Sequence, residues 1–112
     1  GFIFGSALAY KLGTGFIPVR KKGKLPYKTK SVTYQLEYGS DTLEIHEDAL
    51  KANSRVLIVD DLLATGGTVK AVVDLIKAQK AKIVGVAFVV ELKFLKGKER
   101  LKNLPIYSII HY

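Results

Sequence analysis

The stretch VLIVDDLLATGGTVKA, residues 56–71, decides the fold of this chain. Its four successive apolar residues, Val56–Val59, are typical of a strand that is covered on both faces. Asp60 and Asp61 follow, then a glycine-rich turn, and Thr68–Gln79 carries apolar residues at the spacing of a helix. We therefore predict a buried strand that ends in two carboxylates, a tight turn and an amphipathic helix.

The other apolar runs extend this pattern to the rest of the chain. Ile83–Val90 and Tyr107–Ile110 are predicted as two further buried strands, and Ser6–Leu12 as a short helix. Val32–Glu37 and Thr42–His46 alternate polar and apolar residues, which indicates two half-buried strands. Buried strands separated by a helix are typical of parallel sheets. We predict an α/β fold that is doubly wound, with a mostly parallel sheet.

Length and composition are those of one globular domain. The chain has 112 residues, of which 48% are hydrophobic and 25% charged. It has no cysteine, which excludes disulfides and thiolate metal sites and fits a cytoplasmic protein. No apolar run is long enough to span a membrane, so we expect no membrane partner.

The positive charge is concentrated in one segment. The formal net charge is +8, and six of the 18 basic residues lie within positions 20–30: Arg20, Lys21, Lys22, Lys24, Lys28 and Lys30. Such a segment can be a nucleic-acid patch, a solvated loop or a clamp for a multiply charged phosphate ligand. Composition alone favours the solvated loop.

The start of the chain is unusual for a domain. It opens GFIFGSALAY, a turn and an apolar helix without a leading strand. Domain boundaries are normally exposed and polar. We therefore expect the natural domain to have a further N-terminal part before Gly1.

The turn after the two aspartates has the chemistry of an anion site. In open parallel sheets, ligands bind beyond the carboxyl ends of the strands. Glycines allow successive N–H groups to point into one concavity, and the helix N-terminus adds partial positive charge. Two threonines add hydroxyl donors. A phosphate monoester fits best, held by the five residues of the turn: Ala64, Thr65, Gly66, Gly67 and Thr68.

The acidic pair needs a different partner from the phosphate. Asp60 and Asp61 would repel a phosphate group unless they faced hydrogen-bond donors, and the two vicinal hydroxyls of a ribose are such donors. The acidic pair and the turn together therefore describe a ribose 5-phosphate cradle. The alternative is an ordinary N-cap aspartate and a glycine turn that bind nothing, which two adjacent carboxylates disfavour. The motifs of Walker loops and of dinucleotide-binding turns are absent.

Four motifs resemble known enzymes. VLIVDDLLATGGT, residues 56–68, resembles the phosphoribosyl-diphosphate signature of type I phosphoribosyltransferases. RKKGKLP (20–26), LEYG (36–39) and VELKFLKG (90–97) are similar to motifs of the adenine phosphoribosyltransferase family, in the same order. Gly1-Phe2 resembles the end of that family's diphosphate-binding loop. Lys98 stands where the family usually has arginine.

The resemblance implies a reaction, a cofactor and roles for residues. Adenine and 5-phosphoribosyl diphosphate would give AMP and diphosphate, with Mg²⁺ held through the substrate, in a cytoplasmic homodimer. Asp60 and Asp61 would hold the ribose hydroxyls, and residues 64–68 the 5′-phosphate. Residues 21–38 would form a mobile loop over the active site. The remaining roles fall to Arg20, Lys21 and Lys24 at the diphosphate, Leu92 in the base pocket, and Glu37 and Tyr38 in catalysis.

Two other interpretations compete with this one. A response-regulator receiver domain shares the VLIVDD strand but needs a phosphoacceptor aspartate later in the chain, and no aspartate follows Asp74. A non-catalytic relative that binds nucleotide or nucleic acid through its basic surface remains open. Glu37 and Tyr38 favour the enzyme, and we do not expect nucleic acid as a partner.

Overall fold

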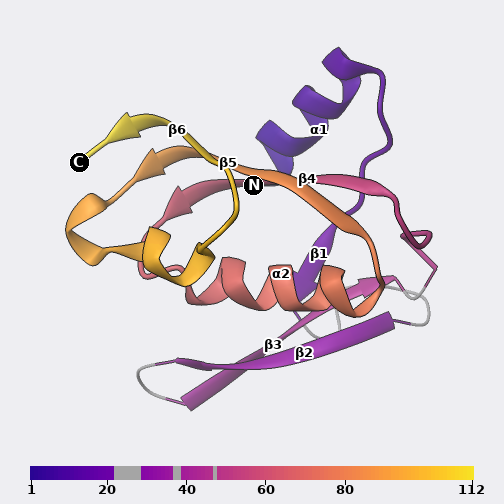
Figure 1. Cartoon of the computed structure of the whole chain (residues 1–112), viewed down its shortest axis with the longest axis horizontal. Helices are drawn as coiled ribbons and strands as arrows, with labels where there is room; N and C mark the ends of the chain where they lie inside the picture. Colours follow the sequence, from indigo (N-terminus) through magenta and orange to yellow (C-terminus); the bar gives the residue numbers. More distant parts are fainter. Residues whose placement is uncertain (22–28, 37–38, 47) are drawn as a thin grey trace. The chain divides into compact units, whose positions relative to one another are not determined.

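Three strands form the parallel sheet that the apolar runs predict. In the computed structural model, β4 (Arg55–Leu63), β5 (Lys82–Glu91) and β6 (Ile106–His111) lie in the order β4-β5-β6. β5 and β6 are parallel, and Figure 1 shows all three arrows pointing the same way. The predicted α/β class with a parallel sheet is confirmed.

The structure describes residues 1–21, 29–36, 39–46 and 48–112. The chain forms two units. The first comprises residues 1–16, 56–66 and 83–112, and the second comprises residues 17–55 and 67–82. Within the described residues, no helix is long and apolar enough to cross a membrane.

The first unit contains the parallel sheet, one helix and two short 3-10 turns. The helix α1 (Phe2–Leu12) ends at Gly13, whose φ of 68° is left-handed, as the predicted helix end requires. The rings of Phe2 and Phe16 meet edge to face, with their centroids 5.9 Å apart. The turns η1 (Lys93–Leu95) and η2 (Gly97–Leu101) connect β5 to β6.

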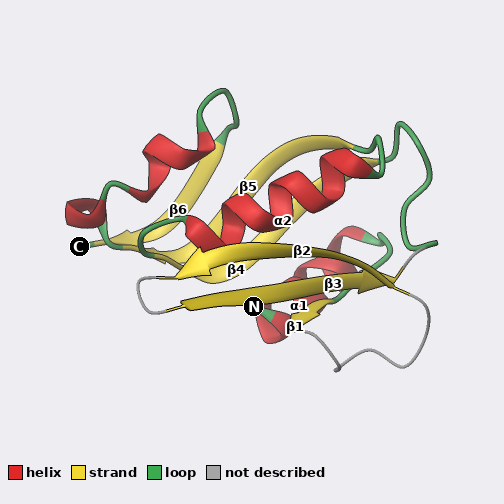
Figure 2. Cartoon of the chain, turned by 90° about the horizontal axis from the view of Figure 1, so that it is seen from below, coloured by secondary structure: helices red, strands yellow, loops and turns green. Residues whose placement is uncertain are grey.

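The second unit is an antiparallel sheet with a helix packed on it. β1 (Val19–Lys21) and β2 (Thr29–Leu36) both pair with β3 (Gly39–His46), which lies between them. β2 and β3 are the two strands predicted from alternation, and Figure 2 shows them side by side. The helix α2 (Gly67–Ala78) contacts both.

The core of the second unit comes from β3 and α2. Leu43 and Ile45 are buried on β3. Between them, the carboxylate of Glu44 accepts a hydrogen bond from the Thr29 hydroxyl at 2.9 Å. On α2, the buried residues follow the helical spacing of the sequence and are Val69, Ala71, Val73, Leu75 and Ile76. The helix predicted from apolar spacing over Thr68–Gln79 is thus confirmed, although Val72 of that segment is only half-buried.

The prediction of strands buried on both faces is wrong for two strands of the parallel sheet. On β4, Ile58 is buried but Leu57 is exposed. β6 is the edge strand of the sheet, so Tyr107 and Ile109 are exposed at 59% and 78%. A continuous apolar run shows that a strand is apolar on both faces, but it does not show what covers each face.

β5 is the central strand of the first unit's sheet. A substitution at Phe88 tests how much its packing stabilises the fold. Phe88 is 2% exposed, whereas Phe94 in η1 is 71% exposed. We expect Phe88→Ala to lower the free energy of unfolding by about 3–5 kcal/mol, because it removes a ring from a packed interior. Phe94→Ala is the matched control and should change it by less than about 0.5 kcal/mol. Urea denaturation measures both values, and equal losses would contradict this packing.

Candidate functional site

The acidic pair lies inside β4 and not at its end. The strand continues to Leu63, so the prediction that it ends at Asp60 and Asp61 is wrong. The reason is backbone pairing, because the Leu92 amide donates a hydrogen bond of 2.9 Å to the Leu63 carbonyl and keeps β4 extended to that point. The pair still belongs to the carboxyl half of its strand, where ligands of open parallel sheets bind.

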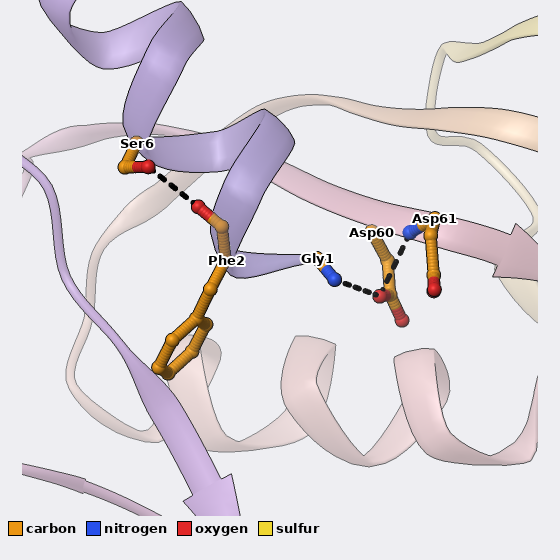
Figure 3. A network of polar contacts seen from close by, with 5 residues as sticks. All are labelled: Gly1, Phe2, Ser6, Asp60 and Asp61. Atoms are coloured by element: carbon orange, nitrogen blue, oxygen red, sulfur yellow. Dashed lines mark hydrogen bonds and ion pairs between the residues drawn. The ribbon is translucent and has the colours of Figure 1, made fainter.

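The two carboxyl groups differ in their surroundings. Asp60 is half-buried, whereas Asp61 is exposed. Oδ1 of Asp60 accepts a hydrogen bond of 2.9 Å from the Asp61 amide and lies 3.6 Å from the Gly1 nitrogen (Figure 3). Figure 3 shows the Asp60 carboxylate between these two nitrogens, next to the start of α1.

These surroundings shift the pKa values of the two carboxyl groups in opposite directions. Burial raises the pKa of Asp60, and the neighbouring Asp61 carboxylate adds to the rise. A hydrogen bond from the Asp60 carboxyl lowers the pKa of Asp61. The pair therefore releases its first proton from Asp61, and Asp60 holds the second to a higher pH.

The turn after β4 has the exposed hydroxyls and the glycine conformation that an anion site needs. Thr65 and Thr68 are exposed. Gly66 has φ of 86°, a left-handed conformation that side chains disfavour. Gly67 is the first residue of α2, so of the two glycines it is Gly66 that the turn requires. The boundary between the units falls between these two glycines.

The other predicted site residues are distributed over the chain. Leu92 is half-buried, directly follows β5, and is tied to the end of β4 by its bond to Leu63. Arg20 and Lys21 lie on β1 in the second unit. The positions of Lys24, Glu37 and Tyr38 lie outside the described residues. Residues 29–36 of the predicted mobile loop form β2, and the mobility of the segment stays a prediction.

Sequence reasoning missed a buried carboxylate at the end of β5. Glu91 is 3% exposed and accepts a hydrogen bond of 3.0 Å from the Ser108 hydroxyl. Lys98 Nζ and His111 Nδ1 lie 3.6 and 3.5 Å from its Oε1. His111 is therefore a partner of this carboxylate. The sequence does contain a signal for it, because Glu91 directly follows the apolar run Ile83–Val90. A carboxylate that is buried at such a position needs hydrogen-bond or charge partners.

The acidic pair offers oxygen donors of the kind that Mg²⁺ prefers. No group of three histidine, cysteine, aspartate or glutamate residues gathers within the described part of the chain. The Asp60 and Asp61 carboxylates are hard oxygen donors, and Mg²⁺ in proteins is commonly bound by one or two carboxylates and substrate phosphates. The chemistry of the pair therefore fits a magnesium ion that arrives with a phosphorylated ligand.

Comparison with known families identifies the fold. The model of the Phosphoribosyl transferase domain family matches residues 1–107, which include the acidic pair, the turn and most of both units. The chain belongs to the phosphoribosyl transferase family. The family's match extends to β6, so the predicted type I phosphoribosyltransferase fold is confirmed over nearly the whole chain.

Individual members of the family are similar over this whole length. An adenine phosphoribosyltransferase of Acidobacterium capsulatum is 61% identical over 112 residues, all of this chain and 62% of that protein. The chain thus spans less than two thirds of the length of that relative. The crystal structure of the enzyme from Thermoanaerobacter pseudethanolicus is 52% identical, with a TM-score of 0.97, covering 100% of this chain and 65% of the other.

A third member was solved with ligands. The adenine phosphoribosyltransferase of Saccharomyces cerevisiae, complexed with an imino-altritol bisphosphate and adenine, is 48% identical to this chain. Its TM-score is 0.92, and the match covers 96% of this chain and 61% of that one.

The opposite pKa shifts in this phosphoribosyl transferase domain predict opposite effects of two similar substitutions. Because the pKa of Asp60 is raised from 3.8 on folding, its contribution to stability is present at low pH and lost as pH rises through the raised value. Asp60→Asn should remove that loss and stabilise the fold at neutral pH. Asp61, whose pKa is lowered, stabilises the fold above its unfolded pKa, so Asp61→Asn should not do so.

Urea denaturation over a pH series measures both effects. Asparagine keeps the Oδ1 acceptor for the Asp61 amide, so Asp60→Asn tests the charge rather than the hydrogen bond. If Asp60→Asn were less stable than wild type at neutral pH, the desolvation argument would be wrong.

Proposed function

We propose that this protein transfers the 5-phosphoribosyl group from phosphoribosyl diphosphate to adenine, giving AMP and diphosphate. The observation that carries the proposal is that one chain segment holds both hydrogen-bond acceptors and a turn suited to an anion. Two adjacent carboxylates, Asp60 and Asp61, lie two residues before the end of β4, and a turn with a left-handed glycine and two exposed threonines follows the strand. This segment supplies acceptors for two ribose hydroxyls and donors for one phosphate.

The relatives support adenine as the base. The protein of Acidobacterium capsulatum that shares 61% of its residues with this chain is named for adenine, and the yeast enzyme was solved with adenine bound. Its second ligand is a bisphosphate of a sugar-like ring, which carries the same kinds of group as the donor proposed here.

The electrostatics of the acidic pair suit this reaction. Displacement at the anomeric carbon of a ribose passes through a state in which the sugar carries positive charge. Preorganised negative charge near the sugar stabilises that state. The hydrogen bond from the Asp61 amide holds the Asp60 carboxylate in place, so we expect it to meet the sugar with little reorganisation. Its raised pKa means that the pair becomes fully charged at a higher pH than it would if Asp60 had its ordinary pKa.

The remaining roles rest on the family resemblance. Arg20, Lys21 and Lys24 would contact the diphosphate, and Leu92 would line the base pocket. Glu37 would handle a proton of the purine and Tyr38 would cover the site. When bound with the donor, Mg²⁺ would neutralise charge on the leaving diphosphate. We also propose that the protein is a cytoplasmic homodimer, as the resemblance implies.

The double variant Asp60→Asn/Asp61→Asn tests the ribose site. Each carboxylate that accepts a hydroxyl hydrogen bond contributes about 1.5–3 kcal/mol, so the affinity for phosphoribosyl diphosphate should fall about 100-fold or more. Calorimetry in the presence of Mg²⁺ measures it. Asp74→Asn is the matched control, since Asp74 is exposed on α2 and pairs with Lys70. Donor affinity that is equal in the double variant and the control would refute the assignment.

AMP formation tests the reaction itself. The whole protein, given labelled adenine, phosphoribosyl diphosphate and Mg²⁺, should produce AMP and diphosphate in equal amounts. It should also discriminate against hypoxanthine. If the protein bound AMP but formed none, and bound RNA in a salt-sensitive way, it would be the non-catalytic relative instead.

A further inference from the structure

We propose that Gly97, in η2, is a positioning residue for the phosphate-binding turn. Its backbone packs directly against the backbone of that turn and holds it in shape. The inference rests on the proposed function, because it assigns the 5′-phosphate to residues 64–68. Gly97 itself need not contact any substrate.

The contact is reciprocal and has no room for a side chain on either partner. A Cβ placed on Gly66 would lie 2.7 Å from the Gly97 carbonyl oxygen and 3.3 Å from its Cα. A Cβ placed on Gly97 would collide with the Ala64 carbonyl oxygen and lie 2.8 Å from Leu63 Cδ1. Both glycines are buried. The turn and η2 therefore touch through main-chain atoms.

A series of backbone bonds brings Gly97 to this point. The Leu92 amide is bonded to the Leu63 carbonyl, at the end of β4. The amides of Leu95 and Lys96 then bond back to the carbonyls of Leu92 and Lys93, which forms the tight turn η1. Lys96 adopts a left-handed conformation, with φ of 54°, and redirects the chain so that Gly97 reaches the turn.

Each of the two segments also ends in a buried leucine. Leu63 and Leu101 are 1% and 2% exposed, at the end of β4 and at the end of η2. A new Cβ on Gly97 would press on the Ala64 carbonyl group as well as on the Leu63 side chain, so a change of rotamer at Leu63 alone could not relieve it. The backbone of the turn or of η2 would have to move.

Such a movement should affect phosphate binding in particular. The N–H groups of a phosphate site act together only when they point at one place, and a misplacement of about 1 Å can cost about 100-fold in function. Gly97→Ala should therefore weaken binding of ribose 5-phosphate by about 10- to 100-fold. It should raise the KM for phosphoribosyl diphosphate more than it lowers kcat.

Gly15→Ala is the matched control. It makes the same substitution in the same unit, but the added Cβ meets nothing within 4 Å. Calorimetry with ribose 5-phosphate should give wild-type affinity for Gly15→Ala and reduced affinity for Gly97→Ala. Equal affinity in the two variants would overturn the role of Gly97. If wild type does not bind ribose 5-phosphate, the proposed function fails instead.

A measurement on wild type covers the case in which Gly97→Ala does not fold. Hydrogen exchange should slow on addition of ribose 5-phosphate both in residues 64–68 and in residues 97–101, because the two segments are packed together. Protection confined to residues 64–68 would overturn the inference. Protection in neither segment would contradict the phosphate assignment itself.

Discussion

The hydrogen bond between the Leu92 amide and the Leu63 carbonyl is the interaction on which the site depends. It joins the carboxyl ends of β4 and β5 at the point where both strands leave the sheet. Everything assigned to the ligand in the first unit follows from that junction. The acidic pair precedes it by two residues, the turn begins directly after it, and Leu92 is itself the residue assigned to the base. One backbone bond thus joins the segments that we propose to bind a sugar, a phosphate and a purine.

The acidic pair illustrates how stability and function can oppose each other. Placing the Asp60 carboxylate in a half-buried position beside a second carboxylate raises its pKa, which means that the folded state resists the charge. A sequence selected for stability alone would place an amide there. We expect the charge to be useful when a ligand supplies hydrogen-bond donors to it. Binding of that ligand would then offset what the charge costs in folding stability.

Sequence reasoning found the elements of the fold better than their surroundings. The helix that ends at Gly13, the strands β2 and β3, and the parallel sheet all follow from local patterns of residues. Periodicity shows which residues can be buried, but it does not show the order of strands in the sheet. The exposure of Tyr107 on the edge strand β6 therefore could not be predicted from it.

The same limit applies to the candidate site. The pattern D-D-L-L-A-T-G-G-T points to a ribose and a phosphate because its chemistry is local. The contact between Gly66 and Gly97 joins positions 31 residues apart in the sequence, and a glycine in a polar segment looks like any other turn residue. The partners of the buried Glu91 are likewise known only from the fold, because β6 brings Ser108 and His111 to it.

The differing environments of the glycines limit how this protein can be engineered for heat resistance. Replacing glycine by alanine commonly stabilises a fold by about 0.4–1 kcal/mol, because the unfolded chain loses freedom. Here the strategy is open at Gly15, where space surrounds the backbone. It is closed at Gly13 and Gly66 by their left-handed backbones, and at Gly97 by the main chain beside it. A design method that ranks glycines by sequence position alone would treat all four as equivalent and would damage the phosphate turn while trying to strengthen the protein.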